Sequence, residues 1–320
     1  MFEVLETAKN VAEKSRHVRI NHEALEKFSR ELAEGALPVP NWDAEHHFKG
    51  SDEETVAYLL AVDTVNFCFW PPPGEKKWEI SYQGKSYSGY YGLAVSVKKT
   101  LESGIPLTDA SFLASLTLNK LRDVLAGTGV LQLMEERLGN LQELGRVLLD
   151  KYRGRASELV AAAGGSAIGL MRRLAADFSS FCDQATYQGQ KVFFYKRAQL
   201  FAADLYGALG GKGLGSFRDI EELTAFADYK LPQVLRHVGV LEYATGLAEK
   251  VDRMIYLDPG SEEEVEIRAN TIWAVELIRQ TVKRLGKNVH ASEIDGLLWN
   301  LGQDDQFRAK PYHRTVTIFY

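Results

Sequence analysis

Apolar residues recur every three or four positions along most of the chain, which is the spacing of one face of an α-helix. Two helix starts are marked independently: Ser51 with Glu54 forms a capping-box pattern, and Ser261 precedes three glutamates that suit a helix N-terminus. The pattern predicts two helices within residues 2–34 and further helices over residues 52–65, 93–102, 111–125, 131–152, 156–163, 166–182, 195–209, 220–227, 232–238, 243–253, 261–285 and 292–301. We therefore expect a mainly α fold.

Strand-like alternation is confined to short stretches. In KKWEISYQGKSYSGYYG, Trp78, Ile80 and Tyr82 share one face, and Gln83-Gly84 is a suitable hairpin turn. Weaker signals lie in residues 188–194 and in the final VTIFY. Since no repeat or low-complexity linker divides the chain, we expect one compact helical domain over residues 1–320 with a small β-hairpin.

Composition narrows the class of protein. The 320 residues are 45% hydrophobic and 25% charged, as in ordinary globular proteins, and the net charge is −5. This balance argues against a broad nucleic-acid surface, although a local pocket for one phosphate stays compatible with it. Cys68 and Cys182 stand far apart in apolar surroundings, so we expect reduced thiols. The sequence shows no Cys/His spacing typical of metal ligands, no apolar signal-peptide core and no apolar run long enough to span a membrane. We therefore expect a cytoplasmic protein with no metal, cofactor or membrane partner. The oligomeric state stays open.

Asp228 is the first candidate for chemistry. It follows a glycine-rich turn at residues 207–215 and the helix predicted over residues 220–227, and its neighbours are Phe226, Tyr229 and Leu231. A carboxylate among apolar residues is costly to bury without a partner or a task. It can cap the next helix, or it can stabilise the oxocarbenium-like state through which an N-glycosidic bond breaks.

Other candidates also carry two interpretations. Lys196 lies in the apolar stretch VFFYKRAQLFAADLY, where it either extends to solvent or enters a pocket beside Asp228 or a phosphate. The segment around NFCFW is either core or the rim of a base-binding pocket, with aromatic faces for stacking and an amide or carboxylate for the base edge. Its candidate residues are Asp63, Asn66, Phe67, Phe69 and Trp70.

Two more pairs complete the candidate set. Trp273 and Glu276 are three residues apart and share a helix face, so they are either a core tryptophan with a solvated glutamate or substrate contacts. His313 and Arg314 precede the apolar end of the chain, where they are either exposed or close on an anion.

Taken together, the motifs NFCFWP, SGYYGL, YKRAQLFAADLY, FADYKLPQVLRH, IRANTIWAVELIR and PYHRT resemble those of the queuosine-salvage protein family over nearly the whole chain. The resemblance implies a helical fold related to helix–hairpin–helix DNA glycosylases. It also implies cofactor-free hydrolysis of queuosine 5′-monophosphate, which releases queuine for tRNA modification.

The resemblance also assigns roles to particular residues. It places the catalytic aspartate at Asp228, the active-site lysine at Lys196 and the residues of the NFCFW region near the base pocket. We also expect Tyr90, Tyr229 and Lys230 among the substrate contacts. The expected partner is the small-molecule nucleotide alone. The rival hypothesis is a helix–hairpin–helix protein that binds nucleic acid, or a DNA glycosylase, which the acidic balance disfavours.

Overall fold

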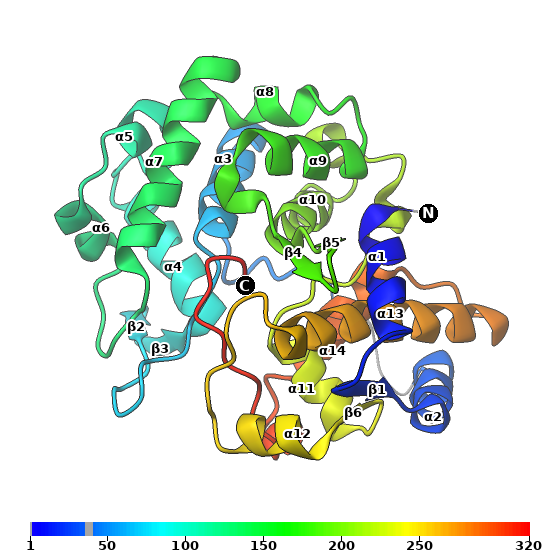
Figure 1. Ribbon diagram of the computed structural model, residues 1–320. Helices are drawn as coiled ribbons and strands as arrows, with labels where there is room; N and C mark the ends of the chain where they lie inside the picture. Colours follow the sequence, from blue (N-terminus) through cyan, green and yellow to red (C-terminus); the bar gives the residue numbers. More distant parts are fainter. Residues whose placement is uncertain (1, 36–40) are drawn as a thin grey trace.

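The computed structural model describes residues 2–35 and 41–320, and most of this chain is helical (Figure 1). The helices are α1 (Glu3–Ala12), α2 (His22–Ala33), α3 (Asp52–Thr64), α4 (Gly89–Glu102), α5 (Ala110–Ala114), α6 (Leu118–Val124), α7 (Met134–Lys151), α8 (Ala156–Ala161), α9 (Ala167–Asp177), α10 (Lys196–Ala208), α11 (Lys230–His237), α12 (Thr245–Asp252), α13 (Glu262–Arg284) and α14 (Ala291–Leu301). Short 3-10 turns are η1 (Ser179–Phe181), η2 (Gly213–Gly215), η3 (Ile220–Glu222) and η4 (Asp305–Arg308). The expectation of a mainly α fold is confirmed.

Within the described residues, the strands form three antiparallel pairs rather than one sheet. They are β1 (Val18–Ile20) with β6 (Leu241–Tyr243), β2 (Glu79–Tyr82) with β3 (Lys85–Ser88), and β4 (Gln184–Tyr187) with β5 (Gln190–Phe193). The predicted hairpin around Gln83-Gly84 is confirmed, and both residues adopt positive φ as its turn requires. The predicted strand signal in residues 188–194 is β5, whereas the final VTIFY forms no strand.

The predicted helix starts are present. The Ser51 side chain accepts the N–H of Glu54 while the Glu54 carboxylate accepts the N–H of Ser51, which completes the capping box of α3. Ser261 caps α13 in the same manner through the N–H of Glu264. The single helix expected over residues 111–125 is wrong, because Thr117 caps a new helix, α6, at the N–H of Lys120. None of the described helices is both long and apolar enough to cross a membrane.

Three clusters of buried apolar residues hold the helices together. The largest lies among α3, α4, α7, α9 and α10, the second among α2, α11, α13 and α14, and the third between α1, α13 and the β4–β5 hairpin. Helix α10 lies near the middle of the molecule, beside α3 and α9 (Figure 1). Helices α10 and α14 belong to different clusters, and a large cavity lies between them.

Candidate active site

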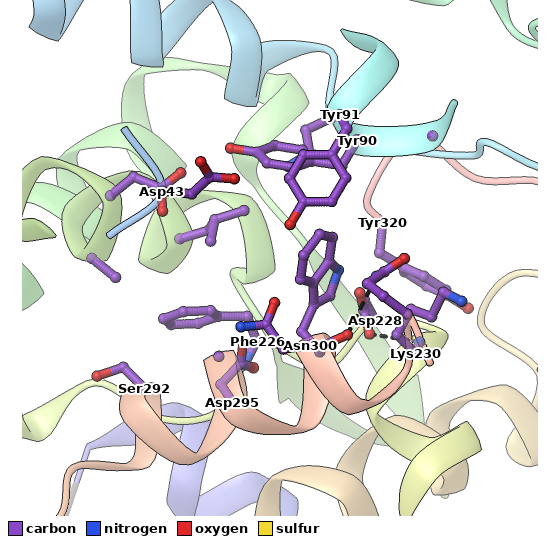
Figure 2. Close-up of a pocket in the computed structure, with 18 of the residues that line it drawn as sticks. Asp43, Tyr90, Tyr91, Phe226, Asp228, Lys230, Ser292, Asp295, Asn300 and Tyr320 are labelled. Atoms are coloured by element: carbon purple, nitrogen blue, oxygen red, sulfur yellow. Dashed lines mark hydrogen bonds between the residues drawn. The ribbon is translucent and has the colours of Figure 1, made fainter. Parts of the chain in front are cut away.

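The cavity has a volume of about 1090 Å³. Two helices line it along one face each, at the three- and four-residue spacing of a helix stripe. Helix α10 contributes Lys196, Leu200, Ala203, Asp204 and Gly207; helix α14 contributes Ser292, Asp295, Gly296, Trp299 and Asn300. The segments before α4 and before α11 supply other parts of its wall (Figure 2). A cavity of this size can hold a nucleotide.

Asp228 lies in the wall of this cavity and is almost fully buried. Its Oδ1 accepts the backbone N–H of Lys230 at 2.7 Å and that of Leu231 at 3.1 Å. The carboxylate therefore caps α11 and faces the cavity at once, so the two interpretations drawn from the sequence are compatible. Burial raises its pKa, while Lys196 and the two N–H groups oppose that rise.

The segment leading to Asp228 is extended, so the helix expected over residues 220–227 is wrong beyond the short turn η3. Side chains take the place of the missing helical hydrogen bonds. The Gln199 side chain accepts the N–H of Thr224 at 3.0 Å, and Asp295 accepts the N–H of Phe226 at 2.7 Å. Because these backbone donors are satisfied by buried side chains, the segment can stay extended inside the protein. The glycine turn is therefore not followed by a helix over residues 220–227, and the expected relation to helix–hairpin–helix glycosylases is not confirmed.

Lys196 is the first residue of α10 and also lines the cavity. Its backbone N–H donates to Asp183, which forms a buried ion pair with Arg268. Burial lowers the pKa of the ammonium group, while the carboxyl groups of Asp228, Asp63 and Asp295 oppose that shift. Among the described residues the structure gives the ammonium group no hydrogen-bond acceptor, so it is free to contact a substrate.

Three further buried carboxyl groups interact electrostatically with this lysine. Asp204 and Asp295 line the cavity, whereas Asp63 lies behind its wall. Burial raises the pKa of Asp63 to about 7 and raises the pKa of Asp204 and of Asp295 well above the ordinary range. The site therefore combines three carboxyl groups whose pKa values are raised with the ammonium group of Lys196 and the capped carboxylate of Asp228. Perturbed titration of several neighbouring groups is typical of catalytic sites.

Two buried arginines fix the NFCFW segment after α3. Arg137 donates to the carbonyls of Val65, Phe67 and Cys68, and Arg197 donates to those of Asp63 and Thr64. They satisfy the carbonyl groups that the end of a helix leaves without intrahelical partners. Because the chain is fixed there, the directions of its aromatic side chains are fixed as well.

Not all residues of this segment face the cavity. Asn66 and Phe69 line it, whereas Phe67 is fully buried against the two arginines. Trp70 packs edge-on against Tyr229, with ring centroids 5.0 Å apart, and so supports the wall from behind. The order of the residues in the sequence could not separate those that face the cavity from those behind it.

Aromatic side chains form much of the cavity wall. Tyr229 packs on Tyr312 with ring centroids 4.7 Å apart, and Tyr90 meets the edge of Trp299 at 5.8 Å. The Tyr90 hydroxyl lies 2.8 Å from Nε2 of His47. Such walls can hold a heterocycle by stacking.

Basic groups gather at one end of the cavity. Lys77, Lys230 and Arg308 all line it there, and the ammonium group of Lys230 donates to the carbonyl of Gly302 at 2.9 Å. Burial and the neighbouring Arg308 lower the pKa of Lys230 to about 8, although Asp228 opposes the shift. Three cations that lie close enough to repel one another are suited to an anionic group.

Trp273 and Glu276 lie away from this cavity. Trp273 lines a second cavity of about 560 Å³ between α1 and α13, with the ammonium group of Lys9 5.5 Å from its ring centroid. Glu276 forms an ion pair with Arg279 at 2.8 Å. Their contact with substrate stays a prediction that this arrangement does not favour.

His313 and Arg314 lie behind the wall at the end of the chain. His313 is buried, with Nε2 3.2 Å from the Tyr320 hydroxyl, and burial with the nearby Arg268 lowers its pKa to about 3. It is therefore uncharged near neutral pH. Arg314 lies beside the ring of Tyr312.

Sequence reasoning missed two buried carboxyl groups that the structure brings to the cavity, Asp204 and Asp295. Each occupies the apolar face of a helix, in LFAADLY and in SEIDGLLW. An acidic residue on an apolar face is a usable signal, because its burial needs compensation. The cation Arg308 was also missed, since it comes from η4, a short turn without a marked sequence pattern.

Comparison with known proteins adds to this geometry. The family model described as queuosine salvage protein matches residues 46–320. A protein of Sphaerobacter thermophilus is 46% identical over 317 residues, which cover 99% of this chain and 97% of that protein. Relatives from Mus musculus and Schizosaccharomyces pombe are 38% and 32% identical, with at least 96% of each chain covered. All three are named queuosine 5′-phosphate N-glycosylase/hydrolase.

Proposed function

The chain belongs to the queuosine salvage protein family, and from this we propose that it hydrolyses the N-glycosidic bond of queuosine 5′-phosphate. The bond between the anomeric carbon and the base breaks, and the base leaves with its electron pair. Water adds to the anomeric carbon and loses a proton, and the base gains one. The products are queuine, available for tRNA modification, and ribose 5-phosphate.

The observation that carries this proposal is the placement of Asp228 in the cavity wall. Its Oδ1 is held by two backbone N–H groups, and among the described residues Oδ2 has no donor. Oδ2 can therefore face the anomeric carbon, stabilise the positive charge that develops there and accept the proton of the attacking water. A fixed carboxylate needs little reorganisation during the reaction.

Lys196 supports this role electrostatically. Burial raises the pKa of Asp228 and so favours its protonated form. The nearby ammonium group of Lys196 lowers that pKa and so favours the ionised form. We propose that Lys196 keeps Asp228 ionised and contacts the sugar. The residues at the basic end, Lys77, Lys230 and Arg308, would then bind the 5′-phosphate.

The remaining wall suits the base. Tyr90, Tyr229 and Phe69 expose aromatic surface toward the cavity, and Asn66 provides an amide for hydrogen bonding. We also propose that residues 1–320 act as one domain, because residues from Asn41 to Tyr320 line the same cavity.

The test is direct. The protein is incubated with queuosine 5′-phosphate, and free queuine is measured by chromatography. We expect release at a rate proportional to protein concentration and not diminished by a chelator. Absence of release from the wild-type protein would contradict the proposal.

A further inference from the structure

The two ends of the large cavity differ in charge. In Figure 2, Lys230 and Asp228 lie toward one end of α14, whereas Ser292 and Asp43 lie toward the other. The basic residues Lys77 and Arg308 share the end of Lys230 and perturb its titration. The opposite end carries carboxyl groups instead.

Asp204 is the buried carboxyl group at that opposite end. It follows Lys196 by eight residues on the same face of α10, which places their backbones about 12 Å apart at 1.5 Å per residue. One turn later, the ring of Trp42 packs so closely on Gly207 that a Cβ there would lie 2.9 Å from it. Asp204 therefore lies along the cavity from Asp228, toward the wall formed by Trp42.

The hydrogen bonds around Asp204 leave one of its oxygens unsatisfied. Oδ2 is inaccessible and has no partner among the described residues, although Asp204 lines the cavity. The neighbouring Asp63 also has an unpartnered Oδ2. Buried carboxyl oxygens without donors are costly, so a pair of them beside the cavity indicates a functional requirement for these acids.

Tyr90 does not supply the missing donor. Nδ1 of His47 lies 2.6 Å from the carbonyl oxygen of Asp43, so this nitrogen must carry the proton. Burial lowers the pKa of His47, so Nε2 is unprotonated and accepts the Tyr90 hydroxyl proton at 2.8 Å. The Tyr90 hydroxyl also lies within reach of Asp204 and lowers the pKa of that carboxyl group, but its one proton is directed to His47.

The charges are unbalanced in the same direction. Around Asp204, the two carboxyl groups of Asp63 and Asp295 act against the cation Lys196. Burial, Asp63 and Asp295 raise the pKa of Asp204, which favours the neutral form of this group. A cation that contacts the carboxyl group from the cavity would replace the proton of the neutral acid.

We propose that Asp204 is a specificity-determining residue that binds a protonated amine of the substrate. This inference rests on the proposed function, because queuosine carries a secondary amine on the methylene group attached to its deazaguanine ring. Ordinary bond lengths place that amine roughly 6 Å from the anomeric carbon. With the anomeric carbon at Asp228, a base that extends along α10 brings the amine toward Asp204.

Binding of free bases tests the proposal without turnover. Isothermal calorimetry compares queuine with 7-deazaguanine, which lacks the aminomethyl group, on wild-type protein, Asp204→Asn and the control Glu221→Gln. Glu221 is an exposed acid of η3, so the control removes the same charge. Loss of a charged hydrogen bond is expected to weaken queuine binding by about 10- to 100-fold. We expect changes below about 3-fold for 7-deazaguanine and for the control.

Proton release gives a second readout that needs no variant. Titrations in two buffers of different ionisation enthalpy report the protons exchanged on binding. We expect wild-type protein to release up to one proton with queuine and none with 7-deazaguanine, because only the amine displaces the proton of Asp204.

The outcomes separate the two ideas. Equal weakening of both bases by Asp204→Asn, or equal proton release with both, would overturn the role of Asp204. Failure of the wild-type protein to cleave queuosine 5′-phosphate would count against the proposed function alone, since the bases bind without reaction. A thermal unfolding scan shows whether Asp204→Asn is folded. If it is not, the proton-release measurement on the wild-type protein tests the role of Asp204.

Discussion

The Asp295 carboxyl group accepts a 2.7 Å hydrogen bond from the backbone N–H of Phe226. This contact joins α14 to the extended segment two residues before Asp228. In a helix the same N–H would bond to a carbonyl four residues earlier, but here a side chain from a distant helix replaces that acceptor. The position of Asp228 therefore depends on how α14 packs.

Removal of this acceptor should loosen the segment. We expect Asp295→Ala to lower the free energy of unfolding by about 1–3 kcal/mol, because the buried N–H of Phe226 loses its partner. It should also lower kcat. Asp295→Asn keeps a carbonyl oxygen and should retain most of the stability. Urea denaturation measures the difference, and equal stability of the two variants would show that the hydrogen bond contributes little.

The outline of the fold was predictable because most of its signals are local. The capping box of Ser51 and Glu54 and the glycine turn at Gln83-Gly84 are set by neighbouring residues, and both were predicted. The segment at residues 220–227 was not. Its apolar residues have helical spacing, but the side chains of Gln199 and Asp295, which are distant in the sequence, accept its backbone N–H groups and keep it extended.

The candidate site divides in the same manner. Asp228 and Lys196 were found because each is charged within an apolar stretch, and both line the cavity. Phe67 and Trp70 belong to the same stretch as Phe69 yet lie behind the wall, because the Arg137 and Arg197 contacts fix the chain there. That arrangement depends on long-range packing, which no local pattern encodes.

Asp228→Asn should remove most of the activity while leaving the fold intact. The amide oxygen can still accept the N–H groups of Lys230 and Leu231, but it carries no charge for the oxocarbenium-like state. We expect kcat to fall by about 10³-fold or more. Asp109→Asn is the matched control, because Asp109 caps α5 through the N–H of Phe112 outside the cavity. Queuine release above a tenth of the wild-type rate would exclude Asp228 as the essential carboxylate.

Lys196→Met should change the pH dependence as well as the rate. The ammonium group lowers the pKa of Asp228, so its loss raises that pKa further. Since the ionised carboxylate is the active form, the acidic limb of the kcat/KM profile should move to higher pH. The profile is measured from pH 4 to 8 on both proteins. An unchanged limb with a lower plateau would mean that Lys196 acts on the substrate alone.

Lys230 provides a test of where the phosphate binds. Burial and Arg308 lower its pKa to about 8, so the group is charged at neutral pH and loses its proton as the pH rises through about 8. We therefore expect KM for queuosine 5′-phosphate to rise between pH 7 and 9, and KM for the nucleoside queuosine to stay constant. Lys230→Gln should raise KM for the nucleotide by about 10-fold at pH 7, the loss of one charge-assisted hydrogen bond, and should flatten its pH dependence. Lys212→Gln, at an exposed lysine, is the control. An equal rise in KM for both substrates would place the phosphate elsewhere, because only a contact with the phosphate distinguishes nucleotide from nucleoside.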